Sequence, residues 1–179
     1  MSKSIKELHY TYDQKFTRVL VISDSHNHIT HAIKVIQSGR YDLVLHLGDI
    51  VSDVDDLRCI FPELNIEGVR GNCDFYDTNY PDILIVTING VKILACHGHQ
   101  FRVKSGTMLL DEYAKKITAK IALYGHSHQH KLSYEEDITL LNPGSIALPR
   151  GGPNPTYGVI EIEKNGVLHS SLQEIKKKK

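Results

Sequence analysis

The feature that most constrains the fold is a set of short apolar runs, each of which ends in a polar turn. Two of them, Arg18–Ile22 and Leu43–Leu47, are nearly continuous aliphatic stretches, the pattern of strands that are buried on both faces. Between them, Thr30–Ser38 has apolar residues at helical spacing, Thr30 is a candidate N-cap, and Gly39 is a stop signal. This order predicts a βαβ unit.

The rest of the chain adds a second helix and then many more strands. A helix is expected over residues 53–61 and a third strand at Ile66–Val69, while Asn89-Gly90 and Asn165-Gly166 predict hairpins. One further helix is expected at Thr107–Lys116. The remaining expected strands are Ile83–Ile88, Val91–Ala95, Ile121–Tyr124, Leu132–Tyr134, Ile138–Leu141 and Tyr157–Ile162. This mixture predicts an α/β fold in which two sheets pack face to face with helices on their outer sides.

The length of 179 residues fits one domain. We expect residues 17–175 to form that domain, residues 1–16 to be an N-terminal extension before the first strand, and residues 176–179, all lysine, to be a solvated basic tail. The turn-rich stretch Pro149–Pro155 is typical of a rigid surface or interface loop, and from it we expect a homodimer.

Composition excludes several classes of protein. Lys plus Arg and Asp plus Glu are both 21, so no net charge favours nucleic acid or an anionic membrane. The apolar runs are too short for a membrane-spanning helix, and the first residues contain no apolar segment of a secretory signal. The three cysteines, Cys59, Cys73 and Cys96, have neither the number nor the spacing of a disulfide framework or a zinc finger. We therefore expect a cytoplasmic protein with reduced thiols.

Polar side chains with metal-binding chemistry follow five of the predicted strands. In sheets with crossover connections, the carboxyl ends of the strands form the crevice where ligands bind, so these five loops are expected to converge. Glycine beside such residues allows the backbone to come close. The five segments are Ser23–His28, Gly48-Asp49, Arg70–Asp74, Cys96–His99 and Gly125–His128.

Carboxylate, imidazole and amide oxygen together suit Mn, Fe or Zn. The candidate ligands are too many for one ion, whereas two ions roughly 3.5 to 4 Å apart that share a carboxylate and a hydroxide would use them all. The pattern thus predicts a two-metal hydrolase. Of the other histidines, His46 is expected in the core and His9, His31 and His169 at the surface. The candidate ligands are Asp24, His26, Asp49, Asn72, His97, His126 and His128.

The order of these motifs resembles the calcineurin-like metallophosphoesterases. The resemblance covers about Arg18 to Ile162, and together with the small size and the stretch Leu141–Ser145 it points to the small single-domain prokaryotic phosphodiesterase branch. The metal-free scaffold subunit of retromer resembles that branch too. The matching motifs are Asp24-Ser25-His26, Gly48-Asp49, Gly71-Asn72-Cys73-Asp74, His97 and Gly125-His126-Ser127-His128.

The resemblance implies a four-layer α/β/β/α sandwich and two divalent metal ions, with Mn expected first and Fe, Zn or Ni as alternatives. By position in the motifs, it implies that Asp24, His26 and His128 bind one ion. It also implies that Asn72, His97 and His126 bind the other and that Asp49 bridges the two.

One position departs from the usual family pattern. Cys73 stands where a histidine usually donates a proton to the leaving group, and a thiol is a weaker hydrogen-bond donor. The small phosphodiesterase branch often has the same cysteine. We therefore expect esters with good leaving groups, or help from another acid such as His99. The alternatives without a catalytic role are that Cys73 is a small, partly buried packing residue and that His99 and Arg70 are ordinary loop residues.

The function expected from the sequence is metal-dependent hydrolysis of a small phosphodiester by a bridging hydroxide. Nucleic acid ends are less favoured as substrates because the net charge is zero. The alternative is a catalytically silent scaffold that binds protein partners. That alternative predicts substituted ligands, and none of the candidate ligands is substituted here.

Overall fold

The computed structural model describes residues 4–176, so residues 177–179 of the expected basic tail lie outside the described part. The helices are α1 (Thr30–Ser38), α2 (Ser52–Ile60) and α3 (Met108–Lys116), with a short 3-10 helix, η1, at His99–Phe101. None of the helices within residues 4–176 has the length and apolar composition of a membrane-spanning segment.

One of the two sheets has five strands in the order β11-β10-β2-β3-β4. Its centre is the predicted βαβ unit, because β2, β3 and β4 run parallel and are connected through α1 and α2. β10 pairs antiparallel with both β2 and β11. In sheet order, the strands span Leu168–Glu174, Thr156–Glu163, Phe16–Ile22, Leu43–His46 and Asn65–Gly68.

The other sheet has six strands in the order β1-β5-β6-β7-β9-β8. β6, β7 and β9 run parallel to one another, and β1 runs parallel to β5, whereas β5/β6 and β8/β9 are antiparallel pairs. In sheet order, the strands span Ile5–Tyr10, Ile83–Ile88, Val91–Cys96, Ile121–Leu123, Ile138–Pro143 and His130–Glu135.

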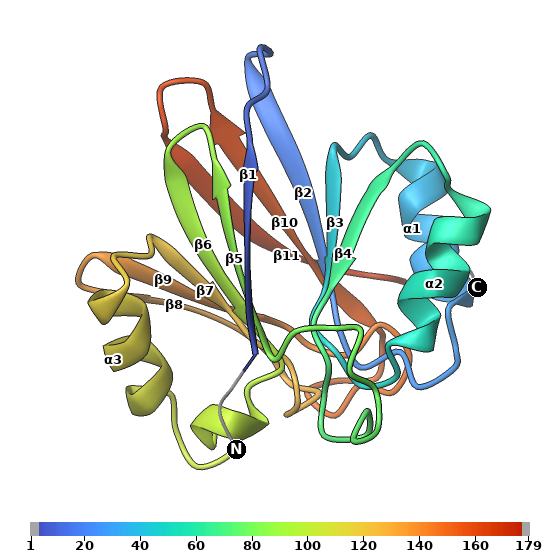
Figure 1. Cartoon of the computed structure of the whole chain (residues 1–179). Helices are drawn as coiled ribbons and strands as arrows, with labels where there is room; N and C mark the ends of the chain where they lie inside the picture. The colour runs from blue at the N-terminus through green and yellow to red at the C-terminus, as the bar shows by residue number, and fades with distance from the viewer. Residues whose placement is uncertain (1–3, 177–179) are drawn as a thin grey trace.

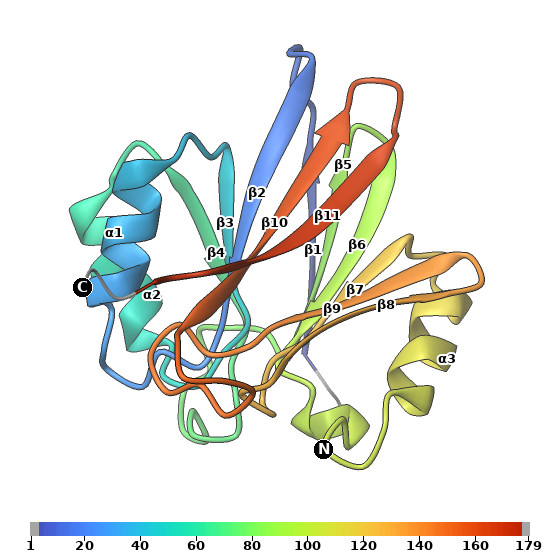
Figure 2. The ribbon, with the colours of Figure 1, turned by 180° about the vertical axis from the view of Figure 1, so that it is seen from behind.

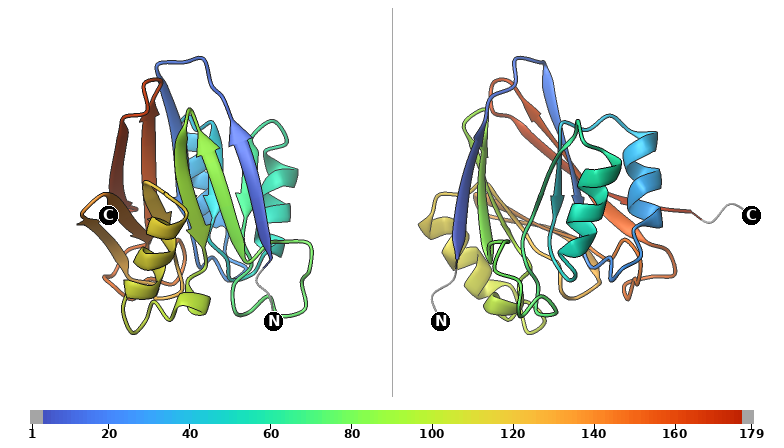
Figure 3. Two further views of the ribbon diagram at one scale, coloured as in Figure 1. Left: turned by 60° about the vertical axis from the view of Figure 1, so that its left-hand side comes forward. Right: turned by 45° about the vertical axis from the view of Figure 1, so that its right-hand side comes forward.

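The two sheets pack face to face, with α1 and α2 outside the five-stranded sheet and α3 outside the six-stranded one (Figures 1 and 2). Figure 3 shows these layers from two further sides. Between the sheets, fully buried side chains such as Val19 and Val86 form one core. Leu110 of α3 and Leu57 of α2 belong to separate cores on the outer faces. The α/β four-layer sandwich of two mixed sheets flanked by helices is thereby confirmed.

Both predicted hairpins are present. Asn89 and Gly90 join β5 to β6, with Ile88 paired to Val91 and positive φ angles of 47° and 82° at the two turn residues. Asn165-Gly166 lies in the turn between β10 and β11. At Asn89-Gly90, positive φ at both central residues is the geometry of the tight turn that matches the twist of the flanking strands.

The N-terminal segment differs from the expectation of an extension before the domain. Ile5–Tyr10 form β1, which pairs in parallel with β5, and Leu8 and Tyr10 pack against the core between the sheets. This part of residues 1–16 is therefore integral to the six-stranded sheet. It was missed because β1 is an edge strand that carries charged, exposed Lys6 and Glu7, so it has no continuous apolar run.

The expected cap of α1 is wrong in detail. Thr30 is the first helical residue, Ile29 occupies the N-cap position, and no side chain caps this end. The turn closed by the His28 amide on the Ser25 carbonyl leads directly into the helix, so Thr30 falls one position too late to act as the cap.

Candidate metal centre

Loops from both sheets meet at one end of the molecule, the lower end in Figure 1. They follow the carboxyl ends of β2, β3 and β4 in one sheet and of β6 and β7 in the other. Each loop carries one of the polar motifs identified in the sequence. The convergence expected from the strand ends is therefore present in the structure.

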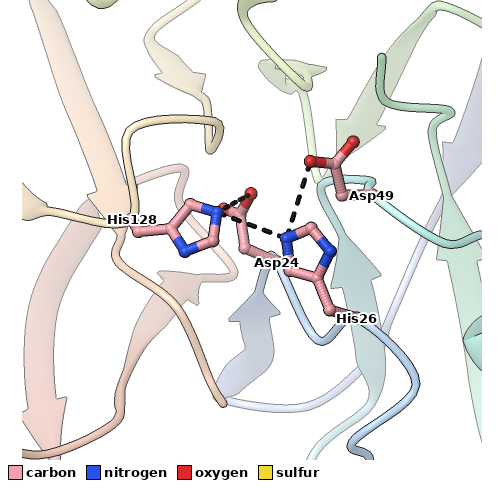
Figure 4. Close-up of side chains that lie close together, drawn as sticks. All are labelled: Asp24, His26, Asp49 and His128. Atoms are coloured by element: carbon pink, nitrogen blue, oxygen red, sulfur yellow. Dashed lines mark hydrogen bonds and ion pairs between the residues drawn. The ribbon is translucent and has the colours of Figure 1, made fainter. Parts of the chain in front are cut away.

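The first group of side chains consists of Asp24, His26, Asp49 and His128, whose ligand atoms all lie within 4.8 Å of one another. Figure 4 shows that they point toward a common centre. His128 Nε2 lies 3.3 Å from Asp24 Oδ1 and 3.3 Å from His26 Nε2. His26 Nε2 in turn lies 3.7 Å from Asp49 Oδ2. Two carboxylates and two imidazoles can therefore face one cation.

The second group consists of Asp49, His97 and His126, again within 4.8 Å of one another. His97 Nε2 lies 3.4 Å from Asp49 Oδ1 and 3.1 Å from His126 Nδ1. The Asn72 side-chain oxygen completes this group, 3.1 Å from the same His97 nitrogen. The structure thus brings together all seven candidate ligands.

Asp49 belongs to both groups, and its two oxygens divide between them. Oδ2 is nearest His26, Oδ1 is nearest His97, and the Cys73 amide donates to Oδ1 at 3.1 Å. The carboxylate is almost fully buried, so it is held in one orientation between the two groups. A carboxylate placed in this way can bridge two cations.

Backbone carbonyls fix the orientation of two of the imidazole rings. His97 Nδ1 lies 2.7 Å from the Leu47 carbonyl, and His128 Nδ1 lies 2.8 Å from the Leu148 carbonyl. Because a carbonyl can only accept, Nδ1 must carry the proton in both rings. Nε2 is then free to donate its lone pair to a metal ion, an arrangement typical of histidine ligands.

Asp24 provides the sharpest test of whether a cation fits. Its carboxyl group is completely buried, and burial raises its pKa although His97 and His128 oppose the rise. Oδ2 accepts from the His126 amide at 3.1 Å, whereas Oδ1 has no hydrogen-bond partner among the described residues. A buried carboxylate oxygen without a donor is costly unless a cation compensates it. The donor set therefore fits a metal ion.

Three further pKa shifts show how these side chains influence one another's charge. Burial alone would raise the pKa of Asp49, but His97 and the Cys73 amide hold it well below its usual range. Burial opposes protonation of His97, yet Asp49 and Asp24 raise its pKa overall. Burial, together with the charges of His97 and Lys104, lowers the pKa of His126 to about 4. His126 is therefore neutral near pH 7, which is the form that binds metal.

A set of buried polar residues behind the ligands holds the loops in place. Ser25 contacts His46 Nε2 at 2.7 Å and donates to Asp53 at 2.5 Å, which ties the loop after β2 to β3 and α2. Ser145 donates to the Asp24 carbonyl at 2.7 Å. Asn142 donates to the Gly125 carbonyl at 2.9 Å. His46 is a buried core residue, as expected.

Sequence reasoning missed the structural part played by Asp53, Asp74 and Ser145. Asp74 Oδ2 accepts from the Gly71 amide at 2.7 Å, and its other oxygen accepts from two amides at the start of α2. Asp74 stands within the Gly-Asn-x-Asp motif, so a signal for it was available. Asp53 had no such signal, because its contact with Ser25 depends on the packing of α2.

The ligand loops have unusual backbone geometry. Non-glycine residues with positive φ are uncommon, yet five of the seven candidate ligands have this geometry. Glycine is required at Gly71, where an added Cβ would lie 2.2 Å from Asp49 Oδ1. The candidate ligands with positive φ are Asp24 (55°), His26 (47°), Asp49 (58°), His126 (68°) and His128 (58°).

Of the residues suggested for proton donation and phosphate contact, Cys73 and His99 lie beside the candidate ligands, whereas Arg70 makes its contacts elsewhere. Cys73 is exposed beside Asp49, and partial desolvation of its thiol, together with the charge of that carboxylate, raises its pKa to about 11. His99 is half-buried, 5.5 Å from His97 between ring centroids, and burial lowers its pKa. Arg70 is committed elsewhere, since its guanidinium binds Asp82 at 2.8 and 3.0 Å and the Asp77 carbonyl at 2.8 Å.

Comparison with known proteins gives the family. The model of the calcineurin-like phosphoesterase superfamily domain matches residues 17–165. The probable metallophosphoesterase YsnB of Bacillus subtilis is 32% identical over 151 residues, which cover 82% of this chain and 85% of YsnB. The phosphodiesterase MJ0936 of Methanocaldococcus jannaschii is 26% identical, with 82% of this chain and 94% of MJ0936 covered. This chain belongs to the calcineurin-like phosphoesterase superfamily.

Solved structures share the same architecture. A predicted phosphoesterase from Streptococcus pneumoniae superposes with a TM-score of 0.70 at 30% identity, covering 90% of this chain and 99% of that one. Vps29 of Entamoeba histolytica, solved in complex with Zn²⁺, gives a TM-score of 0.70 at 21% identity, covering 88% of this chain and 99% of that one. The second likeness concerns the fold alone.

Proposed function

We propose that this chain is a metal-dependent phosphodiesterase with a dinuclear centre. The observation that carries the proposal is the position of Asp49, whose two oxygens face two separate groups of histidine, aspartate and asparagine ligands. Family membership and the phosphodiesterase relative MJ0936 support the same reaction class.

In this proposal, Asp24, His26 and His128 hold one divalent cation, and Asn72, His97 and His126 hold the other. When bound, the two cations would lower the pKa of water to supply a strong nucleophile and would neutralise charge on the phosphoryl oxygens. The oxygen-rich and imidazole donor set, which lacks a thiolate, suits Mn first and also Fe, Zn or Ni.

Residues of the chain itself orient the metal-binding side chains. The Leu47 and Leu148 carbonyls keep the His97 and His128 rings in the metal-binding tautomer. Asn72 is exposed at the edge of the cluster, so its side chain can face a substrate from solvent. Because these groups are fixed before substrate arrives, little reorganisation is needed when charge develops in the transition state.

The site has no strong acid to donate a proton to the leaving group among the residues suggested for this role. The raised pKa of Cys73 keeps its thiol protonated near pH 7, but a thiol is a poor donor. His99 is neutral at that pH, because burial lowers its pKa. We therefore propose that phosphodiesters with good leaving groups are hydrolysed faster than those whose alkoxide needs full protonation. Both residues stay predictions as catalytic groups.

A turnover assay tests the proposal. Protein stripped with a chelator and reloaded with Mn should hydrolyse bis-p-nitrophenyl phosphate, while the stripped protein should not. Asp49→Asn should lower kcat/KM by about 1000-fold or more, because several kcal/mol of transition-state stabilisation depend on the cations. Asp56→Asn is a matched control, since Asp56 is exposed on α2. Absence of turnover with Mn, Ni, Fe, Co and Zn alike would contradict the proposal.

The scaffold alternative makes the opposite prediction for metal content. A silent scaffold needs no ligand set, whereas here the cluster retains every candidate ligand, including the enclosed oxygen of Asp24. Natively purified protein with no bound ion and no turnover after reloading would favour the scaffold. The homodimer stays a prediction, which the molar mass in solution would test.

A further inference from the structure

A polar pocket lies beside the candidate metal centre, since Ser127 of a ligand loop lines it. It has a volume of about 550 Å³ and is lined by the segment before α3, the loop between β7 and β8 together with the first residues of β8, and the loop after β9. All three connections lie at the lower end of the molecule in Figure 1, where the ligand loops also meet. A pocket of this size accommodates part of a small organic ligand.

The charge of this pocket is positive. Lys104, Lys131 and Arg150 line it, and no carboxylate does. Among the residues that the structure describes, none of these three cations has an ion-pair partner. The pocket at Arg58 is different, because Arg58 lies 3.5 Å from the Glu67 carboxylate that lines the same pocket. Unpaired cations that converge on one pocket favour an anionic ligand.

The start of α3 adds to this preference. Gly106 and Thr107 line the pocket, and Thr107, the N-cap residue, makes no capping hydrogen bond through its side chain. The first amides of a helix have no partner within the helix and carry partial positive charge, so they attract anions. Asp111, the acidic residue of the first turn, pairs with Lys115 at 2.9 Å and does not line the pocket.

The pocket is continuous with the ligand loops. Ser127, which lines it, stands between the candidate ligands His126 and His128 in the chain. The Arg150 amide donates to the His128 carbonyl at 2.9 Å, so the loop that carries this arginine is attached to the metal-binding segment. An anion held in the pocket and a phosphodiester held at the metal centre can therefore belong to one molecule.

We infer that this pocket binds a second phosphate group of the substrate, so that the preferred substrates are small phosphodiesters that carry a further phosphate. The inference rests on the proposed function and narrows its substrate class. Lys104 and Arg150 would contact the second phosphate from two different loops. Phosphate contacts of this charge-assisted kind are among the stronger hydrogen bonds in proteins.

Two chromogenic substrates that differ only by the second phosphate test the inference. They are thymidine 5′-(p-nitrophenyl phosphate) and its 3′-phosphorylated form. For the Mn-loaded protein we expect kcat/KM to be about tenfold higher for the 3′-phosphorylated substrate, and K104A/R150A to remove most of this preference. K34A/R40A is the matched control, because it removes the same two types of charge from exposed positions on and just after α1, and it should keep the preference.

A binding measurement separates this inference from the proposed function. Calorimetry of thymidine 3′,5′-bisphosphate binding to protein that has been stripped of metal with a chelator needs no turnover. We expect K104A/R150A to bind this ligand about tenfold more weakly than wild type and K34A/R40A to bind it as wild type does. Equal affinity in all three proteins, together with equal kcat/KM for the two substrates, would contradict the inference that this pocket binds a second phosphate group. Hydrolysis of bis-p-nitrophenyl phosphate would still uphold the proposed function in that case.

Discussion

At the scale of single residues, His46 shows how burial sets the charge of this site. The ring is almost completely buried, and burial together with the nearby His97 charge lowers its pKa to about 4. Its Nε2 lies 2.7 Å from Ser25 Oγ, and its Nδ1 accepts from the Gly48 amide at 3.2 Å. His46 therefore remains neutral and connects two of the ligand loops.

This burial predicts a pH dependence of stability. The unfolded chain protonates His46 near pH 6.5, whereas the folded chain resists protonation down to about pH 4. The stabilisation is complete above pH 6.5 and is lost as the pH falls toward 4, with a magnitude of about 3 kcal/mol. In protein stripped of metal with a chelator, the difference in free energy of unfolding between wild type and His46→Gln should change by about 3 kcal/mol between pH 6.5 and pH 4.

The matched control is His169→Gln, because His169 is exposed. Its free energy of unfolding should follow that of wild type through the same pH window. A His46→Gln curve that also stays parallel to wild type would show that His46 does not resist protonation in the folded protein.

The candidate ligands could be predicted from the sequence because each stands next to a strand end. Asp24-Ser25-His26 and His126-Ser127-His128 are recognisable without any knowledge of packing. The donors and acceptors behind them could not be found in this way. Ser25 reaches Asp53 and Ser145 reaches the Asp24 carbonyl only because distant segments pack together.

At the scale of elements, Asp74 fixes the start of α2 to the loop after β4. One carboxylate oxygen accepts from the amides of Ile50 and Val51 at 3.0 and 2.9 Å, and the other accepts from Gly71 at 2.7 Å. The side chain is buried, so water cannot replace these bonds easily. Asp74 thereby holds the two loops that carry Asp49 and Asn72 at a fixed separation.

Removal of this carboxylate should be costly. Asp74→Ala leaves buried amides without an acceptor and should lower the free energy of unfolding by about 2 to 4 kcal/mol, as measured by urea denaturation. Asp74→Asn keeps one acceptor oxygen and should lose less. Asp56→Ala, at an exposed position on α2, should change stability little. Equal stability of Asp74→Ala and Asp56→Ala would refute this role.

Two strands that have no predicted residue range lie at sheet edges: β1, which was not expected, and β11, which was implied only by the hairpin at Asn165-Gly166. β1 pairs with a strand almost eighty positions away, as the Ser4–Asp82 contact across 78 residues illustrates. β11 contains two serines, a histidine and a glutamine, so its composition resembles that of a loop. Edge strands need only one apolar face, and the strand with which each one pairs depends on tertiary packing. The local pattern of apolar residues in the sequence does not specify that packing.

At the scale of the whole molecule, each candidate metal site takes ligands from both sheets. The first combines Asp24 and His26 of the five-stranded sheet with His128 of the six-stranded one, and the second combines Asn72 with His97 and His126. Packing of the two sheets therefore completes the centre. The zero net charge of the chain does not describe this site, since bound cations would create a local positive centre that attracts phosphate.

Anomalous X-ray scattering from crystals of the Mn-loaded protein tests the central claim most directly. Two anomalous peaks are predicted, one on each side of the Asp49 carboxylate, the first beside His26 and His128 and the second beside His97 and His126. A single peak, or two peaks that Asp49 does not separate, would contradict the dinuclear centre.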